Sequence, residues 1–202
     1  MNHTKGNNPD DKQLIDRILR GDTRAFGTIV KNTERLVTQI LYKMIPVSED
    51  RKDLAQDIYM KVFRSLPGFK FQSKISTWIA QITYNTCLSW IEKKKLYFPG
   101  NLQEEDDRSP VSHEAVYNMP RNSVETERIL FQKEVSVILK KEIESLPPVY
   151  QTLIILFHNE SMSYDELSQI TGLPEGTIKS SLFRARKTLK ENLLSKYQKE
   201  AL

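Results

Sequence analysis

The chain has 202 residues, of which 39% are hydrophobic and 28% charged, an ordinary balance for a soluble globular protein. This length accommodates one medium domain or two small ones. A net charge of only +4 does not by itself indicate a nucleic-acid partner, so the distribution of charge along the chain carries more information.

Several classes of protein are disfavoured at once. A single cysteine, Cys87, excludes an internal disulfide and argues against a cysteine-based zinc site; we expect it to be a packed small side chain. The three histidines have no metal-ligand spacing, and no glycine-rich phosphate loop is present, so we expect no catalysis, no metal and no cofactor. The polar N-terminus and the absence of an apolar run of about 18 residues predict a cytoplasmic protein without membrane insertion.

The first half of the chain has helical periodicity throughout and no alternating strand pattern, which predicts an all-α fold. The expected helices cover about residues 11–20, 22–45, 48–66 and 76–95. Gly21 ends the first helix, Asp22 caps the second and Ser48 caps the third. Pro67-Gly68 separates the third helix from the fourth.

The composition then changes between Tyr97 and Arg128, where seven acidic residues face three basic ones and prolines recur. We interpret this stretch as a flexible acidic linker. The predicted organisation is a disordered N-terminus (1–10), a helical domain (11–96), the linker (97–128), a second helical domain (129–196) and a tail (197–202). Helices are expected at about 129–145 and 149–158, followed by two shorter ones.

Residues 163–190 have the pattern of a helix-turn-helix. Ser163 and Glu166 have capping-box spacing, and Thr171-Gly172-Leu173 forms a tight turn. Pro174 suits the first turn of the next helix. On a helical wheel the core stripe comprises Ile178, Leu182, Ala185 and Leu189.

The opposite side of this second helix is basic. It carries Lys179, Ser180, Phe183, Lys187 and Lys190, flanked by Arg184 and Arg186. Phe183 is a large aromatic on a wet face, where a thymine methyl group would give it a partner. The alternative is a solvated basic helix with Phe183 packed against a neighbour.

Stretches in both predicted helical domains resemble the extracytoplasmic-function (ECF) sigma factors of the bacterial sigma-70 family. The stretches Leu146–Tyr150, Tyr164–Leu167, Gly172–Ser180 and Phe183–Arg186 resemble region 4. Asp53–Asp57 with Val62-Phe63 resembles region 2.2, and Ser76–Ile79 with Asn85 resembles regions 2.3 and 2.4. The linker has no match to the larger middle domain of housekeeping sigma factors.

The resemblance implies a function and partners. The chain would bind core RNA polymerase, through the β′ clamp helices and the β flap, and direct it to promoter DNA as a non-catalytic initiation factor, in a stress response for instance. It also implies an anti-sigma factor as partner. Domain 11–96 would be region 2 and domain 129–196 region 4. The implied polymerase-binding residues share an exposed face of the third helix: Asp53, Gln56, Asp57 and Met60.

Two further sets of residues are implied for DNA. The −35 element would be read by Thr177, Lys179, Ser180, Phe183, Arg184, Arg186 and Lys187. The melted −10 strand would be held by Phe69, Phe71, Trp78, Gln81, Tyr84, Asn85, Lys93 and Lys94, with Tyr84 pointing outward. For Trp78, simple core packing remains an equal alternative. The loop Phe69–Ser73 departs from the family pattern, so the preferred −10 base is open.

Two other classes of function compete with this interpretation. A stand-alone helix-turn-helix regulator would bind duplex DNA by itself, but it does not need aromatics and lysines arranged for unpaired bases, and it usually needs dimer symmetry. A protein-interaction adaptor would leave the basic second helix without a role.

Overall fold

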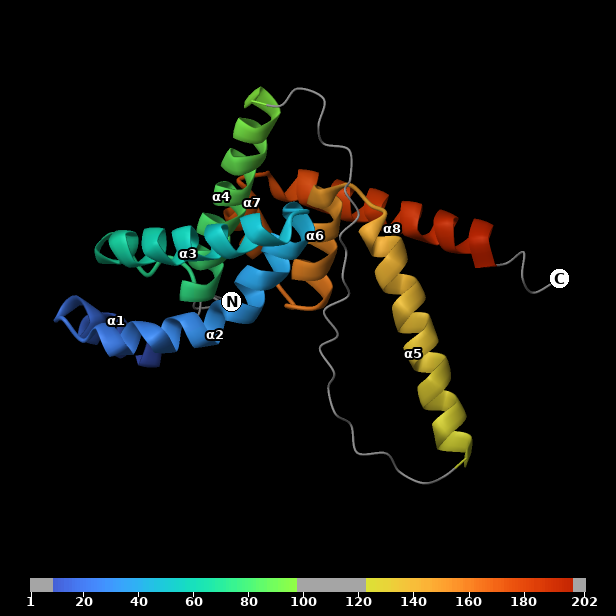
Figure 1. Cartoon of the computed structure of the whole chain (residues 1–202), viewed down its shortest axis with the longest axis horizontal. Coiled ribbons are helices and arrows are strands. Elements are labelled where there is room, and N and C mark those ends of the chain that lie inside the picture. Colours follow the sequence, from blue (N-terminus) through green and yellow to red (C-terminus); the bar gives the residue numbers. More distant parts are fainter. Residues whose placement is uncertain (1–8, 98–122, 198–202) are drawn as a thin grey trace.

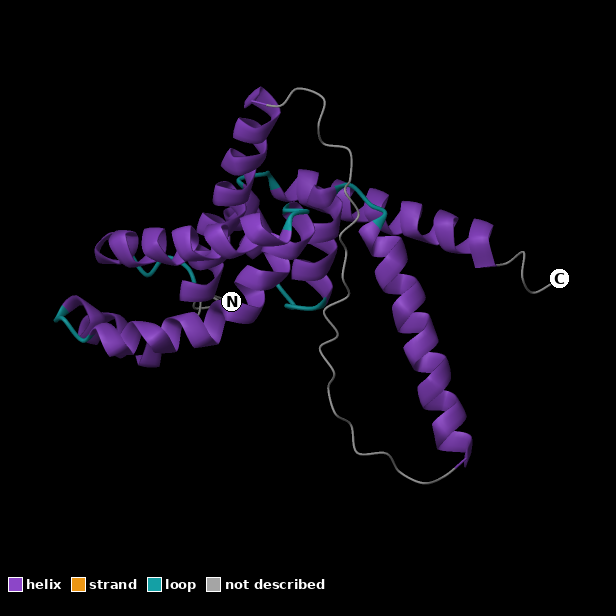
Figure 2. Cartoon of the chain, viewed as in Figure 1, coloured by secondary structure: helices purple, strands orange, loops and turns teal. Residues whose placement is uncertain are grey.

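The computed structural model describes residues 9–97 and 123–197. Residues 1–8 of the predicted disordered N-terminus, 98–122 of the predicted linker and 198–202 of the predicted tail lie outside these ranges. Residues 9 and 10 belong to α1 and residue 197 to α8, so the predicted boundaries at both ends are wrong by one or two residues. Within them, every regular element is a helix (Figure 2), so the prediction of an all-α fold is confirmed.

The N-terminal unit consists of α1 (Pro9–Leu19), α2 (Thr23–Met44), α3 (Ser48–Ser65), the short 3-10 helix η1 (Leu66–Gly68) and α4 (Ile75–Tyr97). Asp22 caps α2 as predicted, because its carboxylate accepts the Ala25 N–H at 3.2 Å. Gly21 has a φ of +100°, which glycine adopts readily. The prediction for Ser48 is wrong: Val47 takes the cap position of α3 without a side-chain hydrogen bond, and Ser48 is already helical.

The C-terminal unit consists of α5 (Ser123–Glu144), α6 (Pro148–His158), α7 (Tyr164–Thr171) and α8 (Glu175–Tyr197). Helix α5 begins at Ser123, within the predicted linker. Its acidic composition favoured a linker, but no proline or glycine follows Pro120 there, and glutamate is a good helix former. Pro174 directly precedes α8 and accepts the Ile178 N–H through its carbonyl oxygen.

The two units pack against each other, α4 against α7 and α2 against α6 (Figure 1). Their buried apolar side chains form one continuous cluster, which includes Val37 and Ile79 from one unit and Leu153 and Leu167 from the other. The sequence predicted two domains joined by a linker; a shared core between them was not anticipated. None of the helices among the described residues is long and apolar enough to span a bilayer.

Candidate nucleic-acid interface

The helix-turn-helix is formed by α7, a short turn and α8. Ser163 Oγ accepts the Glu166 N–H at 3.2 Å, and the Glu166 carboxylate accepts the Ser163 N–H at 2.9 Å, so the predicted capping box is confirmed. Gly172 ends α7 in left-handed backbone, with φ +72°. These contacts fix the point at which the chain turns into α8.

Helix α8 separates a buried stripe from an exposed one. Ile178, Leu182 and Ala185 are fully buried and Leu189 nearly so, which confirms the predicted core. The residues predicted to meet the −35 element are all exposed: Thr177, Lys179, Ser180, Phe183, Arg184, Arg186 and Lys187. Phe183 leaves 67% of its surface open to solvent, which contradicts the alternative that it packs against a neighbour.

Two basic side chains of α8 rest on an aromatic strip, formed by Tyr164 and Phe157, that the sequence did not reveal. Lys179 Nζ lies 5.2 Å from the centre of the Tyr164 ring, and the Arg186 guanidinium 5.1 Å from that of Phe157. The two rings are 5.1 Å apart. Arg186 also approaches the ring of His158, with Nε 3.4 Å from Nε2. Cation–π attraction therefore holds both basic side chains along one flank of the helix.

Helix α3 carries the predicted polymerase-binding face. Leu54, Ile58 and Val62 are buried beneath it. The four predicted residues Asp53, Gln56, Asp57 and Met60 are all exposed. Phe63, which stacks edge-on against Phe26 at 5.1 Å, leaves 42% of its surface exposed beside them. The face is thus partly acidic and partly apolar.

Tyr84 does not point outward, and this prediction is wrong. Its side chain is 3% exposed, and burial raises the pKa of its hydroxyl above the ordinary value. A helical wheel allows α4 one buried face, along Ile79 and Thr86. The helix is also covered on another side by α7, so its buried arc is wider than the periodicity predicts.

The other residues predicted for the −10 strand differ in their solvent exposure. Phe69 is 8% exposed and its ring lies 5.0 Å from Trp78 and 4.9 Å from Phe71. Trp78, Phe71 and Gln81 are half-buried, whereas Asn85 and Lys93 are exposed. Lys94 is half-buried, 3.2 Å from the Asp50 carboxylate and over the Trp90 ring.

The loop between η1 and α4 is shaped by this aromatic packing. Phe71 has a φ of +56°, a left-handed backbone that is unfavourable for a bulky side chain. Contacts among Phe69, Phe71 and Trp78 stabilise the conformation. Trp78 packs against Phe69 and is still only partly buried, so core packing and an exposed edge are both present. Cys87 is buried as predicted, and burial raises the pKa of its thiol to about 12.

Comparison with known proteins identifies both units. Residues 29–97 match the family model for sigma-70 region 2 and residues 136–189 the model for sigma-70 region 4. The chain is 26% identical to the RNA polymerase sigma-H factor of Pseudomonas aeruginosa, over 91% of this chain and 93% of that protein. It is 27% identical to the ECF RNA polymerase sigma-E factor of Escherichia coli K12, over 89% and 92%.

Solved structures share the fold. The sigma factor RpoE of Bartonella quintana, solved with the anti-sigma factor NepR, is 22% identical with a TM-score of 0.60, covering 87% of this chain and 99% of that one. CnrH, solved with the cytosolic domain of CnrY, is 19% identical with a TM-score of 0.59, covering 92% and 98%. The two family models, which together cover more than half of the chain, and the relatives that match nearly its full length show that the chain belongs to the extracytoplasmic-function sigma factors of the sigma-70 family and is a promoter-specific transcription initiation factor.

Proposed function

We propose that α3 docks on core RNA polymerase, that α8 reads the −35 duplex, and that the Phe69–Ser73 loop and α4 hold the melted −10 strand. Residues 11–96 act as region 2 and residues 129–196 as region 4. The observation that carries the proposal is the exposure of all seven −35 residues above a fully buried stripe of α8. A helix anchored in this way can enter a major groove without disturbing its own core.

Within α8, two kinds of DNA contact are proposed. Arg184 donates two hydrogen bonds to a guanine edge, and Phe183 meets a thymine methyl group. Both project from the exposed side of the helix. Lys187 lies further along the helix, where contact with phosphate is expected.

Asn85 and Lys93 are exposed and belong to the proposed −10 site, whereas Tyr84 is buried and does not. Asn85 reads a base edge about two turns along α4 from Trp78, and Lys93 holds phosphate further along the helix. Replacing Asn85 with alanine should spare the closed promoter complex and impair strand opening. Permanganate reactivity of unpaired thymines measures this directly, and normal opening would remove Asn85 from the site.

Two partners and a location complete the proposal. The exposed α3 face, acidic and partly apolar, suits a basic surface such as the β′ clamp helices, and region 4 the β flap. An anti-sigma factor is a further proposed partner, because the Bartonella relative was solved with one. The chain would act in the cytoplasm with the polymerase, without catalysis of its own.

The decisive experiment is transcription by core RNA polymerase with the purified chain, across a promoter library. Promoter-specific initiation is expected. The Asp53→Lys/Asp57→Lys variant should keep its helical circular dichroism, because both carboxylates are exposed, but lose affinity for core polymerase in a pull-down. Tight, sequence-specific duplex binding by the free chain, with no effect on core polymerase, would instead support a stand-alone regulator.

A further inference from the structure

Arg186 is held by two neighbouring rings at the C-terminal end of α6. Its guanidinium carbon lies 5.1 Å from the centre of the Phe157 ring, and its Nε and Nη2 each lie 3.4 Å from Nε2 of His158. The two rings meet edge to face, with their centres 5.1 Å apart. We call Phe157 and His158 the α6 cradle. Because the cradle belongs to another helix, the position of the guanidinium is set from outside α8.

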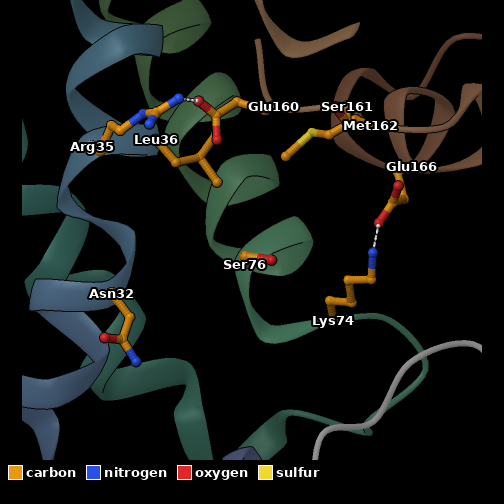
Figure 3. A pocket seen from close by; sticks show the side chains of 9 residues that line it. All are labelled: Asn32, Arg35, Leu36, Lys74, Ser76, Glu160, Ser161, Met162 and Glu166. Carbon is orange, nitrogen blue, oxygen red and sulfur yellow. Dashed lines mark hydrogen bonds and ion pairs between the residues drawn. The ribbon is translucent and has the colours of Figure 1, made fainter. Parts of the chain in front are cut away.

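The turn that follows the cradle is fixed by contacts that do not involve α8. The Met162 N–H donates to the carbonyl oxygen of Leu156 at 3.1 Å, and the Met162 side chain is buried. Glu160 pairs with Arg35 at 2.9 Å beside the cavity shown in Figure 3. The capping box then ties the end of the turn to the start of α7. The cradle is therefore a rigid support for Arg186.

Arg186 lies on a flank of α8 rather than on its front. At about 100° per residue, the front is the line opposite the buried stripe, near Ser180 and Lys187. Of the seven residues predicted for the −35 element, Arg186 is furthest from that line, on the side that contacts α6. A helix about 10–12 Å across fills a major groove about 12 Å wide. Its front then meets base edges on the groove floor, whereas its flanks meet the phosphates of the groove walls.

The guanidinium of Arg186 retains donors for an anion. Arginine has N–H donors and no acceptor, so Nε2 of His158 accepts from it. These contacts use Nε and Nη2, which leaves the N–H groups of Nη1 on a side chain that is exposed. Hydrogen bonds from arginine to phosphate are charge-assisted and strong. The cradle orders the side chain beforehand, so less conformational entropy is lost when a phosphate binds.

Lys179 has a similar support on the same flank, about two turns earlier in α8. It rests on Tyr164, whose ring centre is 5.1 Å from that of Phe157. Lys179 also pairs with Glu175 at 3.4 Å. Arg186 has no carboxylate partner in the part of the chain that the structure describes, so its positive charge is the more available of the two.

We infer that Phe157 and His158 are positioning residues for promoter binding, which hold Arg186 against a phosphate of one strand of the −35 duplex. The inference rests on the proposed role of α8 at the −35 element. It gives Arg186 a phosphate contact rather than a base contact, and it extends the DNA-binding machinery to the end of α6. The sequence did not indicate this role, because His158 and Arg186 are 28 residues apart.

The test measures the promoter affinity of the holoenzyme, formed from core RNA polymerase and the full chain, at several salt concentrations. Arg186→Ala should weaken binding about tenfold for all −35 sequences alike. The slope of log K against log salt should fall by about 0.9. His158→Ala and Phe157→Leu should each weaken binding about two- to tenfold, because Arg186 is no longer ordered beforehand.

Two further variants serve as matched controls for the cradle. His158→Gln offers an amide oxygen to Arg186 and should restore most of the affinity lost in His158→Ala. Asn159→Ala changes the exposed neighbour of His158 and should bind as wild type does. Circular dichroism checks the fold of every variant. Because His158 is exposed, its substitutions should keep the fold even if Phe157→Leu does not.

The combined His158→Ala/Arg186→Ala variant distinguishes positioning from a merely structural role. If His158 acts through Arg186, its loss adds no further weakening once Arg186 is gone. A further loss as large as that of His158→Ala alone would overturn the positioning role. A changed preference at one −35 position in Arg186→Ala would show a base contact and overturn the assignment to phosphate. Promoter-specific initiation by the wild-type holoenzyme, measured in parallel, tests the proposed function separately.

Discussion

Helices α8 and α4 are both proposed to contact promoter DNA, yet the residues predicted to make these contacts differ greatly in solvent exposure. In α8 a buried stripe and an exposed stripe lie on opposite sides, and every residue predicted for DNA is open to solvent. In α4 the predicted residues range from Tyr84, which is 3% exposed, to Asn85, which is exposed. The difference has a physical cause: α8 packs on its own unit, whereas α4 packs on its own unit and on α7 as well.

The sharpest contrast is between two aromatic residues, Tyr84 in α4 and Phe183 in α8. Replacing buried Tyr84 with alanine should lower the free energy of unfolding by about 3–5 kcal/mol, the range for a buried aromatic. Phe183→Ala should change it by no more than about 0.5 kcal/mol, because the ring is exposed. Urea denaturation of both variants measures the difference. Tyr84→Phe is the control, and its free energy of unfolding should stay near that of wild type. Equal losses of stability in Tyr84→Ala and Phe183→Ala would contradict the difference in burial between the two residues.

The next effect concerns the exposed stripe of α8 alone. Arg184→Ala should cost about 1–3 kcal/mol in promoter binding and relax the preference at one position of the −35 element. Lys187→Ala and Lys190→Ala should weaken all promoters about equally and lower the salt dependence. Transcription of a −35 mutant library by each variant holoenzyme separates the two patterns. A uniform loss for Arg184→Ala would show that it contacts phosphate rather than a base.

The same contrast explains what the sequence could predict. The core stripe of α8, the capping box at Ser163 and the cap at Asp22 depend on neighbours a few residues away, and all are confirmed. Tyr84 was misplaced because α4 packs against α2, α3 and α7, so more of its surface is buried than one periodic apolar stripe predicts. The aromatic strip under Lys179 and Arg186 brings together residues from α6, α7 and α8, and periodicity within one helix cannot reveal such a cluster.

A smaller effect on promoter binding is expected where α8 contacts the aromatic strip of Tyr164 and Phe157. Tyr164→Leu removes the ring beneath Lys179 and should weaken promoter binding by about 0.5–1 kcal/mol, the size of an exposed cation–π contact. If the ring aligns Lys179 with a phosphate, the slope of log K against log salt should fall by up to about 0.9. Tyr164→Phe keeps the ring and should keep the slope. Loss of affinity with an unchanged slope would mean that Tyr164 only stabilises the unit.

The smallest expected effect concerns the Lys74–Glu166 ion pair, which joins the start of α4 to α7. Burial raises the pKa of Glu166, but the Ser163 hydrogen bonds and Lys74 outweigh it, so the net pKa is below the ordinary value of 4.5. A carboxyl with a lowered pKa in the folded state contributes stability above its unfolded pKa. That contribution disappears as the pH falls through the lowered value. The free energy of unfolding should therefore decrease with acidification below about pH 4.5, through Glu166 among other groups.

Lys74→Gln removes one cause of that lowered pKa and should make the decrease shallower. At neutral pH its cost should stay under about 1 kcal/mol, because Lys74 is 55% exposed and water screens the pair. Lys187→Gln is the matched control: Lys187 and its partner Glu191 are both more than 60% exposed, so its pH profile should follow wild type. Urea denaturation from pH 7 to pH 3 gives the three profiles. If Lys74→Gln also follows wild type, the Lys74–Glu166 pair contributes nothing to holding α7 on α4. The contact between the two units must then depend on the shared apolar cluster and on the Arg35–Glu160 and Lys43–Glu144 pairs.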